Sequence, residues 1–259
     1  MVKQSGRSIS ELVELALEEL AADDERPFNA LVELQERGDV SVLDAARRLA
    51  EEDDPARRAL AARVLGELGN PDRTFPDECG SILSRLALSD PDISVKKSAL
   101  FALGHLGYRK NESDLLSLET HPDKEIRYGL AFALNGSTDP STVAVQLRLM
   151  DDSYEMVRDW ATTSIGCTLA LDSNSIRDAL LKRINDEDEI VRAEALHGLA
   201  RRNDRRSIPA LIEEIGTEGE RSHPHLFMDA ARCLLQIPEQ DELTKSEIFS
   251  RLVTFGRVN

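Results

Sequence analysis

Apolar residues within positions 90–107 recur at the spacing of one helix face. Val95, Ala99, Leu103 and Leu106 follow one another at intervals of three or four residues, which places them on one side of an α-helix. An Asp-Pro pair opens the stretch and Gly107 closes it, and these residue types favour the start and the end of a helix. The pattern therefore predicts an amphipathic helix over most of this stretch.

The same pattern returns four more times along the chain. It is present in residues 54–69, 123–135, 152–166 and 188–200, at a period of about 30 to 40 residues. Recurrence at such a period is typical of a repeat protein, in which each unit buries its apolar face against its neighbours. The sequence thus predicts a repeat array that forms one continuous domain.

A further helix is expected before each of these signature helices. We name the earlier helix of each pair the A helix and the signature helix the B helix. A sixth B helix is predicted near 225–236, and the A helices are predicted near 40–51, 77–89, 112–119, 140–150, 173–184 and 205–216. The predicted organisation is two N-terminal capping helices in residues 1–38, about six repeats in residues 39–236 and a C-terminal capping helix in residues 237–259. Because no stretch shows the alternation of a strand, we expect an all-α fold.

The aligned B helices resemble the HEAT repeat, especially the short bacterial kind that also occurs in phycobilisome lyase proteins. The consensus of that repeat resembles D-P-x-x-x-V-R-x-x-A-x-x-A-L-G, and the copies here share Asp, a β-branched residue, a basic residue, and then Ala and Leu before a small residue. The resemblance covers about residues 39–236. It implies a right-handed α-solenoid of antiparallel helix pairs, HEAT/armadillo-like, and it implies little about function, because such folds have many unrelated roles.

A basic residue occupies the same position in five of the aligned B helices. We expect these side chains to form a structural ladder of ion pairs with the aspartates of successive units, and contact with a ligand is the alternative. The ladder residues are Arg58, Lys96, Arg127, Arg158 and Arg192. The small residues Gly66, Gly104 and Gly166 are expected to let neighbouring helices approach closely.

The balance of charge narrows the classes of partner. The chain has 48 acidic and 32 basic residues, a formal net charge of −16, which suits a basic protein partner better than phosphate backbones or anionic membranes. Alternatively, the acidity serves only to keep a Leu- and Ala-rich array soluble. No apolar run reaches membrane-spanning length, and the N-terminus lacks the apolar core of a signal peptide. We therefore expect a cytoplasmic protein without a nucleic-acid or membrane partner.

Catalytic and metal-binding motifs are not found. The sequence contains no P-loop, no dinucleotide-binding glycine motif, no zinc-protease motif and no nucleophile elbow. His223 and His225 lack partners at ligand spacing, and three scattered cysteines, Cys79, Cys167 and Cys233, lack the spacing of a disulfide frame or a zinc site. We predict no catalytic residue, no metal site and no cofactor.

Clustered carboxylates precede several B helices. Asp151-Asp152 and Asp186-Glu187-Asp188 lie at the turns between A and B helices, where anions stabilise the following helix N-terminus. We interpret them as helix caps and not as general acids.

The candidate binding residues lie on the B helices. In stacked helix pairs the B helices line the concave side, where such arrays usually bind partners. Exposed aromatic residues flanked by charges are typical of binding hot spots. The partner-binding residues predicted on this basis are Lys97, Phe101, Tyr128, Phe132, Asp159, Trp160 and His197. If the helix phase were shifted by one residue, these rings would instead fill the space between the helix layers.

The function that these observations favour is a non-enzymatic protein-binding scaffold or adaptor. One version of it is an immunity or inhibitor protein that neutralises a basic toxin. The HEAT resemblance leaves two enzymatic alternatives, a bilin lyase or chaperone and, least favoured because of the acidic charge, a DNA glycosylase. The sequence does not specify the partner or the oligomeric state.

Overall fold

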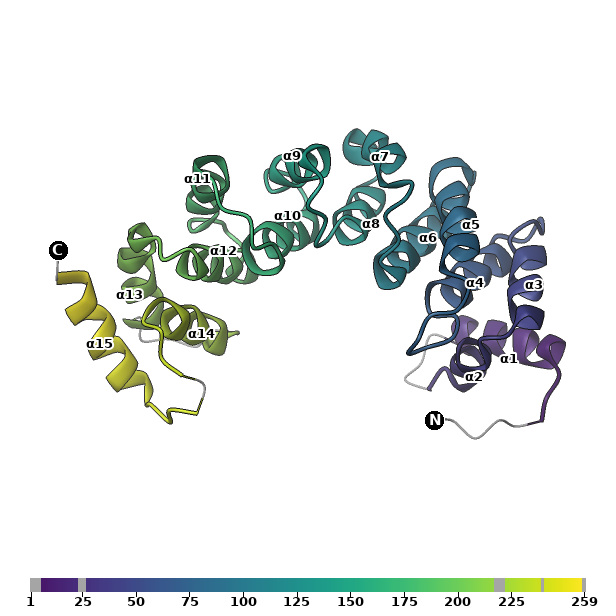
Figure 1. The fold of residues 1–259 in the computed structure, drawn as a ribbon, viewed down its shortest axis with the longest axis horizontal. Coiled ribbons are helices and arrows are strands. Elements are labelled where there is room, and N and C mark those ends of the chain that lie inside the picture. Colours follow the sequence, from purple (N-terminus) through teal and green to yellow (C-terminus); the bar gives the residue numbers. More distant parts are fainter. Residues whose placement is uncertain (1–5, 23–26, 217–221, 239, 258–259) are drawn as a thin grey trace. The chain divides into compact units, whose positions relative to one another are not determined.

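The computed structural model describes residues 6–22, 27–216, 222–238 and 240–257, and every regular element in these ranges is a helix. Figure 1 shows their order along the chain. The helices are α1 (Ile9–Ala21), α2 (Asn29–Arg37), α3 (Val40–Leu49), α4 (Pro55–Gly66), α5 (Pro76–Ser89), α6 (Ile93–Leu106), α7 (Glu112–Leu115), α8 (Lys124–Ala133), α9 (Pro140–Leu149), α10 (Glu155–Thr163), α11 (Asn174–Arg183), α12 (Glu189–Arg201), α13 (Ile208–Gly216), α14 (Pro224–Leu234) and α15 (Lys245–Arg257).

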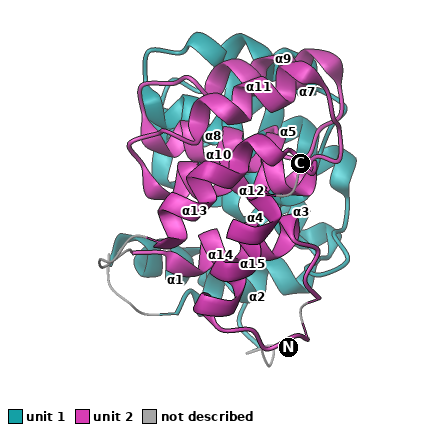
Figure 2. Ribbon diagram, turned by 90° about the vertical axis from the view of Figure 1, so that its left-hand side faces the viewer, with its two compact units in different colours: residues 1–133 teal, residues 134–259 magenta. Residues whose placement is uncertain are grey.

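The chain forms two compact units, residues 1–133 and residues 134–259, which Figure 2 distinguishes by colour. In unit 1 the pairs α3–α4, α5–α6 and α7–α8 follow α1 and α2, and the B helices α4, α6 and α8 pack side by side. In unit 2 the pairs are α9–α10, α11–α12 and α13–α14, with α15 packed against α13 and α14. This stacking of antiparallel pairs confirms the all-α, α-solenoid fold class.

Two of the predicted A helices are not regular α-helices over their whole predicted length. The A helix expected at 112–119 is a short α7 followed by a 3-10 turn over Leu116–Thr120, and the one expected at 205–216 begins with a 3-10 turn over Arg205–Ser207. At the end of α10, the predicted B helix continues as a π-helical turn over Ser164–Thr168. None of the described helices is long and apolar enough to cross a lipid bilayer.

The helix ends follow the capping chemistry of the sequence. The side chain of Ser8 accepts a hydrogen bond from the backbone N–H of Glu11, whose own side chain accepts from the backbone N–H of Ser8, and this reciprocal pair is a capping box. Gly38 ends α2 in the left-handed conformation, with φ at 59°. Such a conformation suits glycine because it has no Cβ.

The aspartates before the B helices have two roles rather than one. Asp92 caps α6 and Asp188 caps α12, each accepting from the first backbone N–H groups of the helix. Asp90 and Asp186, two residues earlier, are buried and are not the caps. The prediction that Asp90 opens α6, and that the whole 186–188 cluster consists of caps, was therefore wrong for these two residues.

Close contact between neighbouring B helices depends on missing side chains. A Cβ on Gly66 would lie 2.8 Å from the Cα of Ala102, and a Cβ on Gly104 would lie 2.5 Å from the ring of Phe132. In unit 2 a Cβ on Gly198 would lie 2.6 Å from the Cα of Gly166. These distances are shorter than carbon atoms tolerate, so the glycines set the spacing of the helices.

Replacing Gly198 by alanine tests this spacing. In an isolated helix the change would be stabilising by about 1 kcal/mol. Here we expect a loss of roughly 1–3 kcal/mol of unfolding free energy, because the new methyl group meets the backbone of Gly166, which has no flexible side chain to yield. Urea unfolding followed by circular dichroism measures the sign, and a rise in stability would contradict the close approach.

Candidate functional site

The arginines at the basic position bind the turn before their own helix in a recurring way. The Nη1 atom of Arg58 donates to the carbonyls six and five residues upstream, at 2.9 and 2.8 Å. Arg127, Arg158 and Arg192 donate to the carbonyls at the same two upstream positions. Lys96 reaches only the carbonyl of Leu88, at 2.9 Å, because an ammonium lacks the planar fork of a guanidinium.

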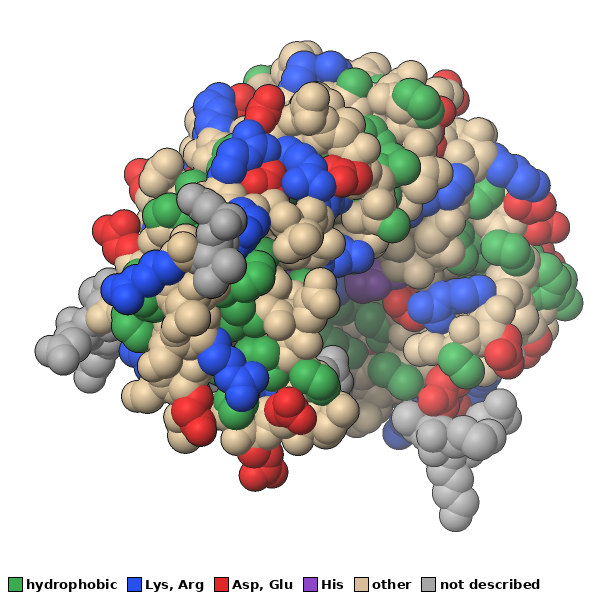
Figure 3. All heavy atoms as spheres, turned by 60° about the vertical axis from the view of Figure 1, so that its left-hand side comes forward, with side chains coloured by type: hydrophobic (Ala, Val, Ile, Leu, Met, Phe, Trp, Pro, Cys, Tyr) green, Lys and Arg blue, Asp and Glu red, His purple; other side chains and the backbone are tan. Residues whose placement is uncertain are grey.

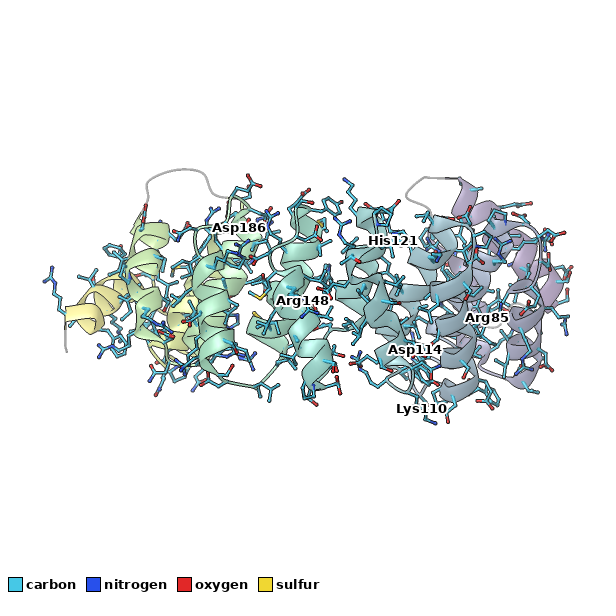
Figure 4. All side chains as sticks on the ribbon, turned by 90° about the horizontal axis from the view of Figure 1, so that it is seen from above. Arg85, Lys110, Asp114, His121, Arg148 and Asp186 are labelled. Atoms are coloured by element: carbon cyan, nitrogen blue, oxygen red, sulfur yellow. The ribbon has the colours of Figure 1, made fainter. Side chains whose placement is uncertain are left out.

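Three of these arginines also form an ion pair with a later element. Arg58 pairs with Asp90, with its Nε 2.7 Å from Oδ2 and its Nη2 2.9 Å from Oδ1. Arg158 pairs in the same two-pronged way with Asp186, which Figure 4 labels, and Arg192 pairs with Glu214 at 2.8 Å.

Lys96 departs from this pattern. In the repeat that follows it, the position equivalent to Asp90 and Asp186, six residues before the basic residue, is His121. The ladder of inter-repeat ion pairs is therefore not uniform along the chain.

The seven predicted binding residues divide between the units. Lys97, Phe101, Tyr128 and Phe132 lie on α6 and α8 of unit 1, and the other three, Asp159, Trp160 and His197, lie on α10 and α12 of unit 2. All seven are partly buried, and none is fully enclosed in the core. We call the side of the B helices that carries them the B-helix face.

The rings on the B-helix face of unit 1 pack on one another. Phe101 meets Tyr128 edge-on with ring centroids 5.0 Å apart, and it meets Phe132 at 4.9 Å. Lys97 forms an ion pair with Glu125, and its ammonium lies 6.0 Å from the centroid of Tyr128. Phe101 thus joins a half-buried aromatic cluster that bridges α6 and α8.

A groove of about 520 Å³ runs beside this cluster between α2, α4 and α6. Its lining includes Arg63, Glu67, Lys97, Phe101 and His105. His105 lies 3.4 Å from the carboxylate of Glu67, which also pairs with Arg73 outside the lining. Burial lowers the pKa of the Arg63 guanidinium, although that side chain remains charged at neutral pH.

The B-helix face of unit 2 is acidic. Burial, together with the charges of Glu194 and Asp188, raises the pKa of Asp159 to about 7. Glu194 accepts a hydrogen bond at 2.8 Å from the thiol of Cys167, whose sulfur lies 3.8 Å from Nδ1 of His197. Among the described residues no basic side chain forms an ion pair with Asp159 or Glu194.

The pKa shifts of the cysteines and of His197 determine whether Cys167 could act as a nucleophile. Burial and the charge of Glu194 raise the pKa of the Cys167 thiol, and burial raises the pKa of Cys79 to about 12 and that of Cys233 above its usual range. Burial also lowers the pKa of His197. A reactive cysteine needs the opposite shift, so Cys167 and His197 do not form an activated pair.

The described parts of the chain contain no group of three His, Cys, Asp or Glu side chains that could hold a metal ion. The rings of His223 and His225 lie 6.2 Å apart in an edge-on arrangement. On the face in view in Figure 3, acidic and basic side chains are interspersed.

The sequence did not identify two important arginines. Arg63 stands at the aligned position where Phe101 and Phe132 occur, and this break in the pattern was the available signal. Arg202 lies just after α12, and its guanidinium donates to five backbone carbonyls, those of Ile165, Gly166, Leu169, Leu171 and Gly198. Nothing in the local sequence indicates that role.

Comparisons with known proteins agree with this architecture. A family model described as HEAT repeats matches residues 81–166. Protein YibA of Escherichia coli strain K12 and that of strain O157:H7 are each 27% identical over 191 residues, which is 70% of this chain and 66% of the relative. The chain therefore spans just under two thirds of the length of these curated relatives.

A solved structure shows the same fold. The X-ray structure of Escherichia coli YibA superposes with a TM-score of 0.68 at 21% identity, covering 100% of both chains. A HEAT-like repeats protein from Thermococcus onnurineus NA1 is more distant, with a TM-score of 0.45 at 18% identity over 97% of this chain and 99% of that one. The family-model match and the YibA relatives, together with the recurring helix pairs and their arginine contacts, show that residues 81–166 match HEAT repeats and that the chain is similar to HEAT-repeat proteins.

Proposed function

We propose that the chain is a non-enzymatic scaffold that binds another protein through the B-helix faces of its units. The observation that carries this proposal is the aromatic cluster of unit 1. Phe101 packs on both Tyr128 and Phe132, all three rings remain partly exposed, and Phe101 also lines an open groove. Aromatic side chains at the edge of a groove supply much of the binding energy of protein interfaces.

The acidic B-helix face of unit 2 favours a partner protein with a basic surface. Asp159 and Glu194 raise the local negative charge next to Trp160, in a chain whose formal net charge is −16. A lysine or arginine brought beside Asp159 would favour its ionised form. Binding through this face should therefore strengthen as pH rises through about 7, the pKa of Asp159, and it should weaken as salt is added.

A catalytic role has little support in these units. The thiol and imidazole on the B-helix face of unit 2 have pKa shifts opposite to those of an activated pair. The family model that matches residues 81–166 describes HEAT repeats, an architecture typical of helical scaffolds. We therefore place the function in binding.

The proposal is tested by capturing partners from native cell extract on the immobilised chain. Tyr128→Ala removes a ring from the B-helix face of unit 1, and Trp160→Ala removes one from that of unit 2. We expect each change to weaken capture of a partner identified with the wild-type chain by at least about tenfold, the cost of one hot-spot residue. Titration of the purified partner against each variant gives the affinity.

Phe28→Ala is the matched control, because Phe28 is an aromatic residue with 42% exposure that lies outside the B helices. It should leave the affinity unchanged. Thermal unfolding of each variant checks that the loss of binding does not come from loss of structure. Equal affinity for wild type, Tyr128→Ala and Trp160→Ala would refute binding through these faces.

A further inference from the structure

The charges around the unit 1 groove are compensated except at one residue. Glu67 is held by Arg73, and Lys97 is held by Glu125. Within the described residues, no carboxylate lies within ion-pair distance of the Arg63 guanidinium. The backbone carbonyl of Arg63 accepts a hydrogen bond from Nε2 of Gln35 at 3.0 Å. This hydrogen bond does not involve the Arg63 side chain.

Arg63 is exposed to solvent and forms part of the lining of the groove. The groove around it has Phe101, Leu31 and Ala102 as apolar lining, and the hydroxyl groups of Ser94 and Ser98 are its small polar groups. Desolvation by the groove walls lowers the pKa of Arg63, although the residue as a whole is exposed. A guanidinium in such a setting matches a carboxylate, because its planar fork can form two parallel hydrogen bonds.

We propose that this groove binds an acidic side chain, Asp or Glu, on a segment of a partner protein, with an adjacent apolar residue against Phe101. One uncompensated guanidinium matches the single charge of a carboxylate. The doubly charged form of a phosphate group would be matched better by a second free cation, and the lysine in the lining, Lys97, is already paired with Glu125. The proposal rests on the scaffold function above and specifies the chemistry of the partner at unit 1.

The net charge of the chain does not oppose this assignment. At physiological ionic strength, charges beyond about 8 Å are largely screened, whereas a bound carboxylate would contact Arg63 directly. The groove lining contains two basic side chains, Arg63 and Lys97, and one acidic side chain, Glu67. The local charge is therefore opposite in sign to the formal net charge of −16.

A random 12-residue peptide library displayed on phage and selected against the full-length chain tests the groove. We expect the selected peptides to be enriched in Asp or Glu next to a large apolar residue. Fluorescence anisotropy then compares one selected peptide with its amide twin, in which Asp is replaced by Asn or Glu by Gln. The wild-type chain should bind the acidic peptide at least about tenfold more tightly than the twin, as for a charge-assisted pair.

Arg63→Gln should remove this preference, so that both peptides bind with the same reduced affinity. Arg85→Gln is the matched control, since Arg85 lies on the A helix α5, labelled in Figure 4, and is paired with Glu51. That change also removes one positive charge from unit 1, and it should leave the tenfold preference intact. Equal thermal midpoints for both variants show that folding is unaffected.

Absence of acidic enrichment, failure to select any peptide, or a preference that survives Arg63→Gln would each overturn the proposal. These results are distinguishable from failure of the scaffold function. If Tyr128→Ala and Trp160→Ala abolish partner capture while Arg63→Gln does not, the scaffold stands and the carboxylate site is wrong. If the wild-type chain captures no partner, the scaffold fails independently of the peptide result.

Discussion

Replacing Asp186 by alanine is expected to lower the unfolding free energy of unit 2 by about 3–5 kcal/mol, the usual cost of breaking a buried ion pair by removing one partner. The side chains of Asp186 and Arg158 are only 3% and 7% exposed. Asp186 accepts hydrogen bonds from Nε and Nη2 of Arg158, from Nη1 of Arg183 and from the backbone N–H of Asp188. Its removal leaves the buried Arg158 guanidinium with only the exposed carboxylate of Glu187, 3.5 Å from its Nη2, as a counter-charge.

Urea unfolding followed by circular dichroism measures the loss, and hydrogen exchange of α10 and α12 shows where it falls. The matched control is Asp44→Ala, which breaks the exposed pair of Asp44 with Arg47, with side chains 47% and 50% exposed. That pair is worth at most about 1 kcal/mol. Similar losses for Asp44→Ala and Asp186→Ala would contradict the structural role assigned to the buried pair.

The difference in unfolding free energy between wild type and Asp186→Ala should decrease at low pH. Burial alone would raise the pKa of Asp186, but the hydrogen bonds from Arg158 and the N–H of Asp188, together with the charge of Arg158, outweigh it, and the net pKa is lowered. A carboxyl group with a lowered pKa in the folded state contributes its full stability above its unfolded pKa of about 4. The difference between wild type and Asp186→Ala should therefore be constant near neutral pH and shrink as pH falls below about 4.

Replacing Arg202 by methionine is expected to cost roughly 3 kcal/mol or more. The Arg202 side chain is 5% exposed, and its donors satisfy carbonyls at the end of the π-helical turn and in the segment that follows it. Loss of a charged donor leaves several of these buried acceptors without a partner, each at a cost of about 1–3 kcal/mol before water or local rearrangement compensates. Methionine retains most of the side-chain length and tests the hydrogen bonds themselves.

Arg202→Lys should recover only a small part of the loss, because an ammonium cannot span carbonyls that lie on both sides of a guanidinium plane. Lys182→Met is the control in the same unit, since Lys182 is 60% exposed and paired with Asp151. It should change the unfolding free energy by less than about 1 kcal/mol. A stability of Arg202→Met equal to that of Lys182→Met would show that the carbonyls find other partners.

Much of the fold could be predicted from the sequence because its signals are local. The helical spacing of Val95, Ala99 and Leu103, repeated along the chain, identified the B helices and the HEAT resemblance. Helix ends such as those at Ser8 and Gly38 are also local features, since a cap depends only on residues within one turn. The helix phase also placed the seven predicted binding residues outside the fully buried core.

The side-chain partners could not be predicted, because they depend on where the next repeat places its turn. Asp90 and Asp186 follow the same Asp-x-Asp pattern as the caps Asp92 and Asp188, yet they bind arginines 32 and 28 residues upstream. Equally, the π-helical turn, which supplies two of the five carbonyls that accept hydrogen bonds from Arg202, has no sequence signature.

The sequence by itself determined the repeated helices, because the periodicity of apolar residues is set within a few residues. Only the tertiary structure decided which charges are compensated. Ion pairs and grooves join residues from separate repeats, and their distances depend on the stacking of the helices. Lys97 forms an ion pair with Glu125 and Glu67 forms one with Arg73, while no carboxylate among the described residues pairs with Arg63.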